Sequence, residues 1–184
     1  YGGESGGQAV ADVLFGDYNP SGKLPITFYR DTTQLADFED YSMKGRTYRY
    51  MTAEPLFQFG YGLSYTSFQY SNLQMSKKKL KANEQIEVAV TITNTGKYDG
   101  EEIVQLYLRD KVGSIVRPMK ELKDFQKINL KAGETRTIKF IINKEKLSIF
   151  NQQLQWVTEP GALELMIGAS SKDIRLKDNF ELIK

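Results

Sequence analysis

The chain has 184 residues, of which 40% are hydrophobic and 26% charged, and its 25 basic and 23 acidic residues give a formal net charge of +2. This near balance gives no electrostatic reason to expect nucleic acid or an anionic membrane surface as a partner. The chain contains no Cys and no His, which excludes disulfides, thiolate and imidazole metal sites, and His-dependent catalytic triads from within it. The compartment stays undecided, because secreted proteins need not carry disulfides.

Residues 1–29 predict one helix followed by one short strand. Ser5 and Gln8 fit a capping box, the apolar residues that follow recur on one helical face, and Gly16 is a typical helix stop. Residues 24–28 are typical of a strand whose proline favours an edge position. One helix and one strand bury little surface together. We therefore expect them to be the end of an α/β domain whose body precedes them in a longer protein.

Residues 30–71 form a connecting segment that is rich in aromatic residues and has little regular pattern. Flexible linkers are poor in aromatic residues, so we expect this segment to pack across one or both domains. Arg46 and Arg49 are interpreted as docking residues for a carboxylate of a neighbouring domain, with a sugar hydroxyl as the alternative. Because the missing domains would cover them, we expect partial exposure of three tyrosines: Tyr41, Tyr48 and Tyr50.

Residues 72–184 predict an antiparallel β-sandwich, with a β-barrel as the alternative. Apolar and polar residues alternate along four clear strands, at 86–93, 104–108, 138–142 and 163–167, and weaker candidates lie at 69–75, 121–130, 153–157 and 179–183. A short helix is indicated at 144–150. The alternation predicts six inward-facing residues: Val88, Val90, Leu106, Phe140, Leu165 and Ile167.

Two single features of this region have more than one interpretation. The basic run 77–79, with Lys81, is interpreted as a solvated strand end or turn rather than a binding patch. Trp156 is the only Trp of the chain, and we expect it to anchor the sandwich core or its rim. The alternative for Trp156 is an exposed platform on which a sugar ring stacks.

Four segments resemble glycoside hydrolase family 3, in the order that the family has them. Residues 6–28, GGQAVADVLFGDYNPSGKLPITF, resemble the end of its second, α/β-sandwich domain. Residues 55–66, PLFQFGYGLSYT, resemble the passage from that domain into a C-terminal fibronectin-III-like domain, and residues 117–125 and 160–175 resemble this last domain. The resemblance implies a mainly β chain: a fibronectin-III/immunoglobulin-like sandwich preceded by a small α/β remnant and the connecting segment.

The resemblance also implies a parent enzyme that removes single sugars from β-linked gluco- or xylo-oligosaccharides with retention of configuration, using two carboxylates. In the family, the nucleophilic Asp comes from an N-terminal barrel domain and the acid/base Glu from an upstream part of the second domain. Neither motif is present in this sequence. We therefore assign no catalytic, substrate-binding or metal-binding residue and no cofactor, and we expect the chain alone to be inactive.

The favoured function is a non-catalytic structural module whose partners are the upstream catalytic domains of the same polypeptide. A carbohydrate-binding module is the main alternative, and an unrelated interaction sandwich is a weaker one. For the parent enzyme we expect an extracytoplasmic location, periplasmic or secreted. Residues 45–50, GRTYRY, resemble wording frequent among xyloside-acting members, so β-glucosidase and β-xylosidase are named together.

Acidic residues were considered separately as candidate catalytic groups. Glu4 precedes the predicted helix, and we interpret it as an anion placed near a helix N-terminus rather than an active-site carboxylate. The other acidic residues considered lie in turns or on polar strand faces, where solvation keeps the pKa of a carboxyl group low. They are Glu87, Asp99, Glu134 and Glu164.

Overall fold

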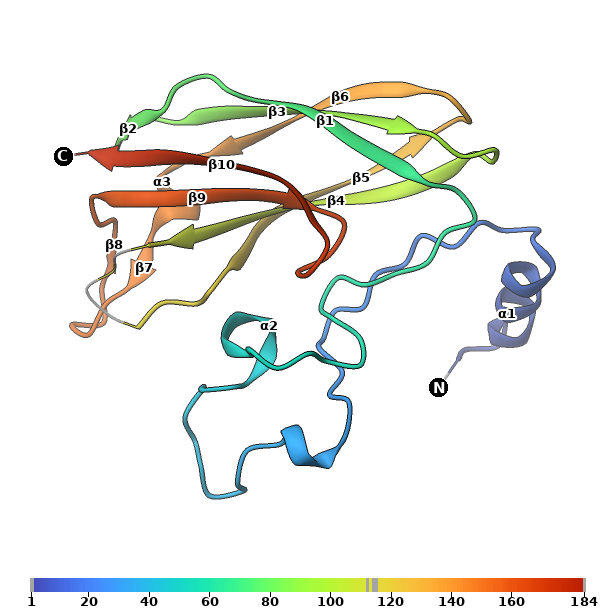
Figure 1. The fold of residues 1–184 in the computed structure, drawn as a ribbon, viewed down its shortest axis with the longest axis horizontal. Coiled ribbons are helices and arrows are strands. Elements are labelled where there is room, and N and C mark those ends of the chain that lie inside the picture. The colour runs from blue at the N-terminus through green and yellow to red at the C-terminus, as the bar shows by residue number, and fades with distance from the viewer. Residues whose placement is uncertain (1, 112, 114–115, 184) are drawn as a thin grey trace.

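The computed structural model describes residues 2–111, 113 and 116–183. It shows a β-sandwich with an N-terminal region, residues 2–67, that extends from one end (Figure 1). The strands are β1 (Phe68–Met75), β2 (Lys79–Lys81), β3 (Ile86–Asn94), β4 (Gly100–Asp110), β5 (Glu121–Leu130), β6 (Thr135–Ile142), β7 (Ile149–Phe150), β8 (Trp156–Val157), β9 (Gly161–Gly168) and β10 (Ile174–Ile183). The helices are α1 (Gly6–Phe15), α2 (Thr47–Tyr50) and α3 (Lys144–Leu147), with a 3₁₀ turn η1 (Thr32–Gln34).

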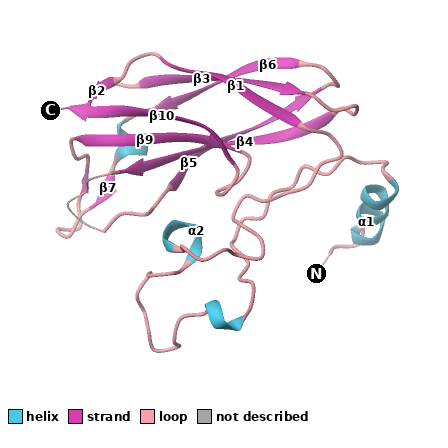
Figure 2. Ribbon diagram, viewed as in Figure 1, coloured by secondary structure: helices cyan, strands magenta, loops and turns pink. Residues whose placement is uncertain are grey.

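Two sheets form the layers of the sandwich, as Figure 2 shows. One sheet has the order β1-β3-β6 and the other the order β2-β10-β9-β4-β5, while β7 and β8 form a separate hairpin. Neighbouring strands are antiparallel except β2 and β10, which are parallel. Each weaker strand candidate of the sequence contains strand residues, and the basic run at 77–79 leads into β2. The fibronectin-III-like sandwich is confirmed. The barrel alternative is wrong, because the two sheets remain separate.

The core lies between the two sheets and follows the predicted alternation. Along β3, buried and half-buried residues alternate without a break. All six predicted inward residues are buried, with at most 1% of each exposed. Burial of a Val, Leu, Ile or Phe side chain contributes about 1.5–3 kcal/mol each, so this core is the main source of the sandwich's stability.

Strand β4 departs from simple alternation, because it is buried on both faces in its middle. Residues 104–108 are all buried, although the sequence pattern predicts that Gln105 and Tyr107 face solvent. The connecting segment covers them. Tyr48 stacks on Phe59 with ring centroids 4.3 Å apart. The Tyr48 ring also meets the Tyr107 ring edge to face, with centroids 6.0 Å apart. The five-stranded sheet is therefore covered on its outer face by residues that precede the sandwich in sequence.

The N-terminal region has little core of its own. Helix α1 contains no buried residue, and Gly16 ends it in the left-handed conformation with φ of 86°, as predicted. The predicted capping box is wrong: Ser5 makes no side-chain cap, and the Gln8 amide donates to Asp12 instead. The predicted strand at 24–28 is reduced to backbone pairing with residues 56–61, including one bridge between Phe28 and Phe57.

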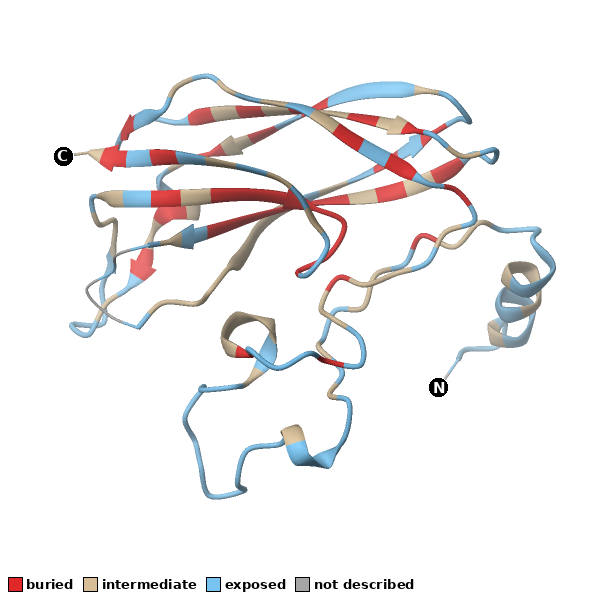
Figure 3. Cartoon of the chain, viewed as in Figure 1, coloured by how far each residue is buried: buried red, intermediate tan, exposed pale blue. Residues whose placement is uncertain are grey.

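The connecting segment divides into an exposed and a packed part (Figure 3). Residues 35–45 are all exposed in this chain, whereas Met51 and Thr66 further along are buried. Packing of residues 35–45 against further domains stays a prediction. The expected partial exposure of the tyrosines is confirmed: Tyr41 is 90% exposed, and Tyr48 and Tyr50 are half-buried.

Two expectations for the end of the sandwich are wrong. The helix indicated at 144–150 is a single turn, α3, capped by the Asn143 side chain, after which β7 begins. Trp156 lies outside the core and is 71% exposed. It stands in β8 opposite Phe150, and the hairpin holds both rings at the surface.

Candidate interdomain site

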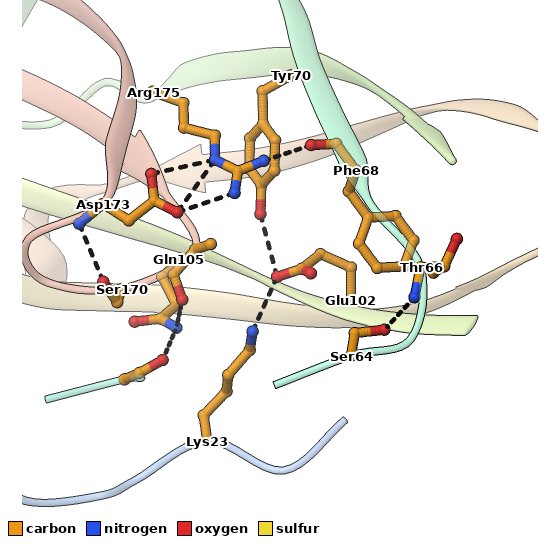
Figure 4. Close-up of polar contacts among 12 residues, drawn as sticks. Lys23, Ser64, Thr66, Phe68, Tyr70, Glu102, Gln105, Ser170, Asp173 and Arg175 are labelled. Carbon is orange, nitrogen blue, oxygen red and sulfur yellow. Dashed lines mark hydrogen bonds and ion pairs between the residues drawn. The ribbon is translucent and has the colours of Figure 1, made fainter. Parts of the chain in front are cut away.

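The N-terminal region is attached to the sandwich by buried polar contacts. Figure 4 shows the central ones. Lys23, from the loop after α1, pairs with Glu102 of β4 at 3.2 Å, and the two side chains are only 14% and 6% exposed. Glu102 also accepts a hydrogen bond of 3.2 Å from the hydroxyl of Tyr70 in β1. Burial, together with the Glu102 charge, raises the pKa of Tyr70, so its hydroxyl stays protonated as a donor.

Arg175 of β10 closes the same cluster from the other side. Its guanidinium lies 4.8 Å from the centre of the Tyr70 ring and donates to both oxygens of Asp173 and to the carbonyl of Phe68. The hydrogen bond with Asp173 raises the pKa of Arg175. A polar cavity of about 240 Å³ lies among these groups. Lys23 and Glu102 are the buried charges of this cluster, and a buried charge needs a partner, so each of these two side chains depends on the other remaining in place.

A second set of contacts fixes the loop at residues 17–22, here called the N-terminal arm. Asn19 donates to the carbonyl of Asp99 at 2.9 Å and accepts from the amide of Tyr65 at 2.8 Å. The hydroxyl of Ser21 donates to Glu101 at 2.9 Å. The arm is thereby tied to the sandwich and to the end of the connecting segment at once.

The glycines of the segment FGYGLSY explain why this segment can lie so close to its neighbours. Gly60 has φ of 80°, and a Cβ there would lie 2.3 Å from the side-chain oxygen of Gln105. A Cβ on Gly62 would lie 2.2 Å from the carbonyl oxygen of Gly22. Only glycine fits both places without a shift. The segment is thus shaped to pack on the sheet and on the N-terminal arm.

Arg49 takes part in the same docking, as the sequence predicts. Its guanidinium lies 3.3 Å from the carboxylate of Glu121 in β5, and its carbonyl accepts a hydrogen bond from the amide of Met119. Arg46, the other candidate, donates to the carbonyl of Asp40 within the exposed loop. The docking interpretation therefore holds for Arg49, toward the sandwich of its own chain.

The N-terminal region presents an apolar surface that no other described part of the chain covers. Most of the large, exposed apolar side chains of the described chain lie before residue 66, and Figure 3 shows α1 as partly exposed and partly intermediate, and residues 35–45 as exposed. Soluble proteins rarely leave large contiguous apolar patches in water unless they serve as an interface. We call this set the uncovered apolar surface: Val10, Leu14, Phe15, Tyr18, Ile26, Phe28, Leu35, Phe38, Tyr41, Met43, Leu56, Phe57, Leu63 and Tyr65.

Four of the five acidic candidates named from the sequence make contacts of their own in the structure. Glu4 is exposed and lies directly before the N-cap of α1. Glu87 pairs with Lys139, and Asp99 accepts from the amide of Ala132. Hydrogen bonds from the Lys131 amide and from Arg136 lower the pKa of Glu134, which is opposite to what a general acid requires.

Among the described residues, no three Asp or Glu side chains lie together so that they could hold a metal ion. No described helix is long and apolar enough to cross a membrane.

Sequence reasoning missed the polar cluster around Glu102. Its members come from four separate parts of the chain, and no local spacing connects Lys23, Glu102 and Arg175. A weak signal was available at Glu102, where a carboxylate occupies a position in phase with the inward residues Val104 and Leu106. Gly60 and Gly62 belong to the segment PLFQFGYGLSYT that the sequence singles out, but their close contacts appear only in the folded chain.

Comparison with known proteins agrees with the fold. The model of the glycosyl hydrolase family 3 C-terminal domain matches residues 1–65, and that of the fibronectin type III-like domain matches residues 102–171. The periplasmic β-glucosidase of Salmonella typhimurium is 42% identical over 195 residues, covering 100% of this chain and 25% of that protein. The xylan 1,4-β-xylosidase of Xylanibacter ruminicola is 46% identical over 178 residues, covering 96% of this chain and 20% of that protein.

A solved structure agrees as well. That of β-glucosidase 3B from Thermotoga neapolitana, in complex with α-D-glucose, has a TM-score of 0.87 at 39% identity, covering 99% of this chain and 27% of that one. The chain spans about a quarter of the length of the curated relatives it matches. Two domain models in succession, with relatives alike along nearly the whole chain, show that the chain belongs to glycoside hydrolase family 3, as a C-terminal part of such an enzyme.

Proposed function

We propose that the chain is a non-catalytic structural module that braces the catalytic domains of an exo-acting, retaining β-glycosidase. One observation carries the proposal: the uncovered apolar surface lies in a region that buried polar contacts tie to a complete sandwich. A surface of this kind is suited to packing against further protein. The sandwich then acts as the fixed support for the N-terminal region.

The proposed partner is the remainder of the same polypeptide. Relatives that are named β-glucosidase or β-xylosidase are about four to five times as long as this chain, which supports further domains in the parent protein. We divide the chain into the end of an α/β domain (1–29), the connecting segment (30–71) and the fibronectin-III-like domain (72–184). The uncovered apolar surface falls in the first two of these parts.

We further propose that the chain alone has no glycosidase activity. Retaining hydrolysis needs a protonated carboxylic acid and an opposing carboxylate roughly 5 Å apart in a closed pocket. Several acidic residues of the chain are engaged in other contacts. Glu101, for example, pairs with Lys127 and accepts a hydrogen bond from Ser21. These contacts lower the pKa of Glu101, so it is ionised near neutral pH and unsuited to act as an acid.

The substrate class of the parent enzyme follows from the names of the relatives. Both β-glucosidases and β-xylosidases occur among them, so we propose a β-linked gluco- or xylo-oligosaccharide. An extracytoplasmic location remains part of the proposal, and the Salmonella relative is named a periplasmic enzyme.

A pair of assays tests the proposal. The purified chain should not hydrolyse nitrophenyl β-glucoside or β-xyloside above the buffer rate, whereas the longer polypeptide should hydrolyse at least one. In the longer polypeptide, Leu14→Asp on the uncovered apolar surface should lower thermal stability and activity. Phe125→Ala, at an exposed Phe of the sandwich, is the matched control and should leave both unchanged. Turnover by the chain that disappears on mutating one of its acidic residues would overturn the proposal.

A further inference from the structure

The hairpin of β7 and β8 presents two aromatic rings to solvent at the end of the sandwich away from α1 (Figure 1). Trp156 is 71% exposed and Phe150 is 47% exposed, and their ring centroids lie 5.4 Å apart at an interplanar angle of 54°. Trp is highly buried in most proteins, and its indole prefers a partner surface to water. Two adjacent exposed rings therefore indicate a surface made for contact.

The chain fixes the hairpin in place, so the rings are held ready before any ligand arrives. Ile149, which pairs with Val157, is buried and anchors the hairpin to the sandwich. At the turn, the Asn151 side chain accepts hydrogen bonds of 3.0 Å and 2.9 Å from the amides of Gln153 and Gln155. A rigid platform loses little conformational freedom on binding, which favours affinity.

The surroundings of Trp156 are polar on one side. A hollow of about 650 Å³ has Trp156 as its aromatic wall, and hydrophilic side chains form the rest: Asn83, Glu84, Gln85, Asn143, Lys144, Glu145 and Ser148. The amide oxygen of Asn143 caps α3, which leaves its NH₂ group as the donor on that side. One flat apolar face within a ring of amides, carboxylates and a hydroxyl suits a sugar better than an apolar ligand.

A second hollow is lined by both Trp156 and Phe150. Trp156 therefore borders two hollows, which leaves room for an oligosaccharide chain to continue beyond the sugar that stacks on the indole. A β-linked gluco- or xylopyranose carries its hydroxyls equatorially, so the axial C–H groups of the ring form a flat apolar face. That face fits the indole, while the equatorial hydroxyls reach outward to the polar groups.

We propose that Trp156 and Phe150 form a surface site for β-linked gluco- or xylopyranosyl chains. The site goes beyond the proposed bracing function, because it would hold the enzyme close to polysaccharide. Only the sugar class rests on that proposed function. With a single stacking platform, binding should be weak and readily reversible.

Because Trp156 is the only Trp of the chain, its intrinsic fluorescence reports on this site alone. Titration with xylohexaose or cellohexaose should give a saturable blue shift of the emission, and titration with glycerol should not. A linear response equal to that of glycerol would overturn the proposal. This result is independent of the glycosidase assays, so either proposal can fail while the other stands.

Variants locate the binding. In affinity electrophoresis through soluble xylan or β-glucan, the chain should be retarded, and Trp156→Ala should remove the retardation. Trp156→Phe should keep part of the retardation. Phe125→Ala, the exposed-Phe control, should be retarded as much as the unsubstituted chain. The same loss with Trp156→Ala is expected in the longer polypeptide. Retardation that survives Trp156→Ala, or a loss confined to the isolated chain, would contradict the site and leave Trp156 as a contact to another domain.

Discussion

The sandwich buries most of its large apolar side chains, whereas the residues before it leave many of theirs exposed. From β1 onward, one continuous core joins both sheets, and each of its buried residues is at most 8% exposed. Before β1, large apolar residues such as Leu14, Phe15 and Phe38 are 72%, 85% and 93% exposed. The sandwich can therefore account for its own stability, whereas the N-terminal region carries residues whose burial requires further protein.

The contact between the two regions combines aromatic packing, such as that of Tyr48 against Tyr107, with directional polar pairs. Lys23 with Glu102, and Ser21 with Glu101, are specific pairs that fix one arrangement. Polar pairs contribute less free energy than apolar packing does, but their directionality limits how the regions can sit. The apolar core therefore stabilises the sandwich, and the polar contacts fix where the N-terminal region lies on it.

The largest difference in stability between the two regions is expected from a substitution in the sandwich core. Leu165 is fully buried in β9, so Leu165→Asp should abolish folding, because an unpaired carboxylate adds a large desolvation cost to about 2–5 kcal/mol of lost packing. The matched variant Leu14→Asp, on exposed α1, should leave the melting temperature of the isolated chain nearly unchanged. Circular dichroism melts of both variants measure this. Equal losses at the two positions would mean that α1 belongs to the same core.

A smaller effect is expected where the connecting segment meets β4. Gly60→Ala should cost about 2–4 kcal/mol, because it adds a left-handed alanine and pushes Gln105 out of its buried hydrogen bonds. Gly133→Ala is the matched control: φ there is 76° and the space beside it is open, so only the backbone cost of about 1 kcal/mol applies. Urea unfolding of the two variants separates the terms. Similar midpoints would show that the close contact with Gln105 has no energetic weight.

The smallest expected effect is the pH dependence of the N-terminal arm. Hydrogen bonds from Lys127 and then Ser21 hold the pKa of Glu101 below its ordinary value of 4.5. A lowered carboxyl pKa stabilises the folded form above the ordinary value, and this stabilisation is lost as the pH falls through the lowered pKa. The amide NMR signals of the arm should therefore shift as the pH falls below about 4.5, while those of β3 remain.

Two variants check this assignment. Glu101→Gln should remove the shift of the arm signals, and Glu134→Gln should not. The pKa of Glu134 is also lowered, but by the Lys131 amide and Arg136 in the turn between β5 and β6. An unchanged arm titration in Glu101→Gln would assign the effect to another group.

Local pattern was enough to predict the sandwich, because alternation in a strand depends only on neighbours two residues apart. Local pattern failed where distant segments meet. The alternation predicts that Gln105 and Tyr107 face solvent, but Tyr48 and Gly60 cover them. The capping box at Ser5 failed because Gln8 has a nearer partner in Asp12. The favoured interpretation of Trp156, at the core or its rim, is wrong, because hydrophobicity alone does not distinguish a buried indole from the exposed one that was the alternative.

Hydrogen–deuterium exchange tests most directly the claim that residues 1–65 depend on further domains and the sandwich does not. In the isolated chain, amides of β3, β4 and β9 should be strongly protected, while those of α1 exchange almost freely. In the longer polypeptide, α1 should gain protection of at least tenfold, and the sandwich strands should change little. Amides of α1 that are as well protected in the isolated chain as those of β3, or that stay unprotected in the longer polypeptide, would contradict the account.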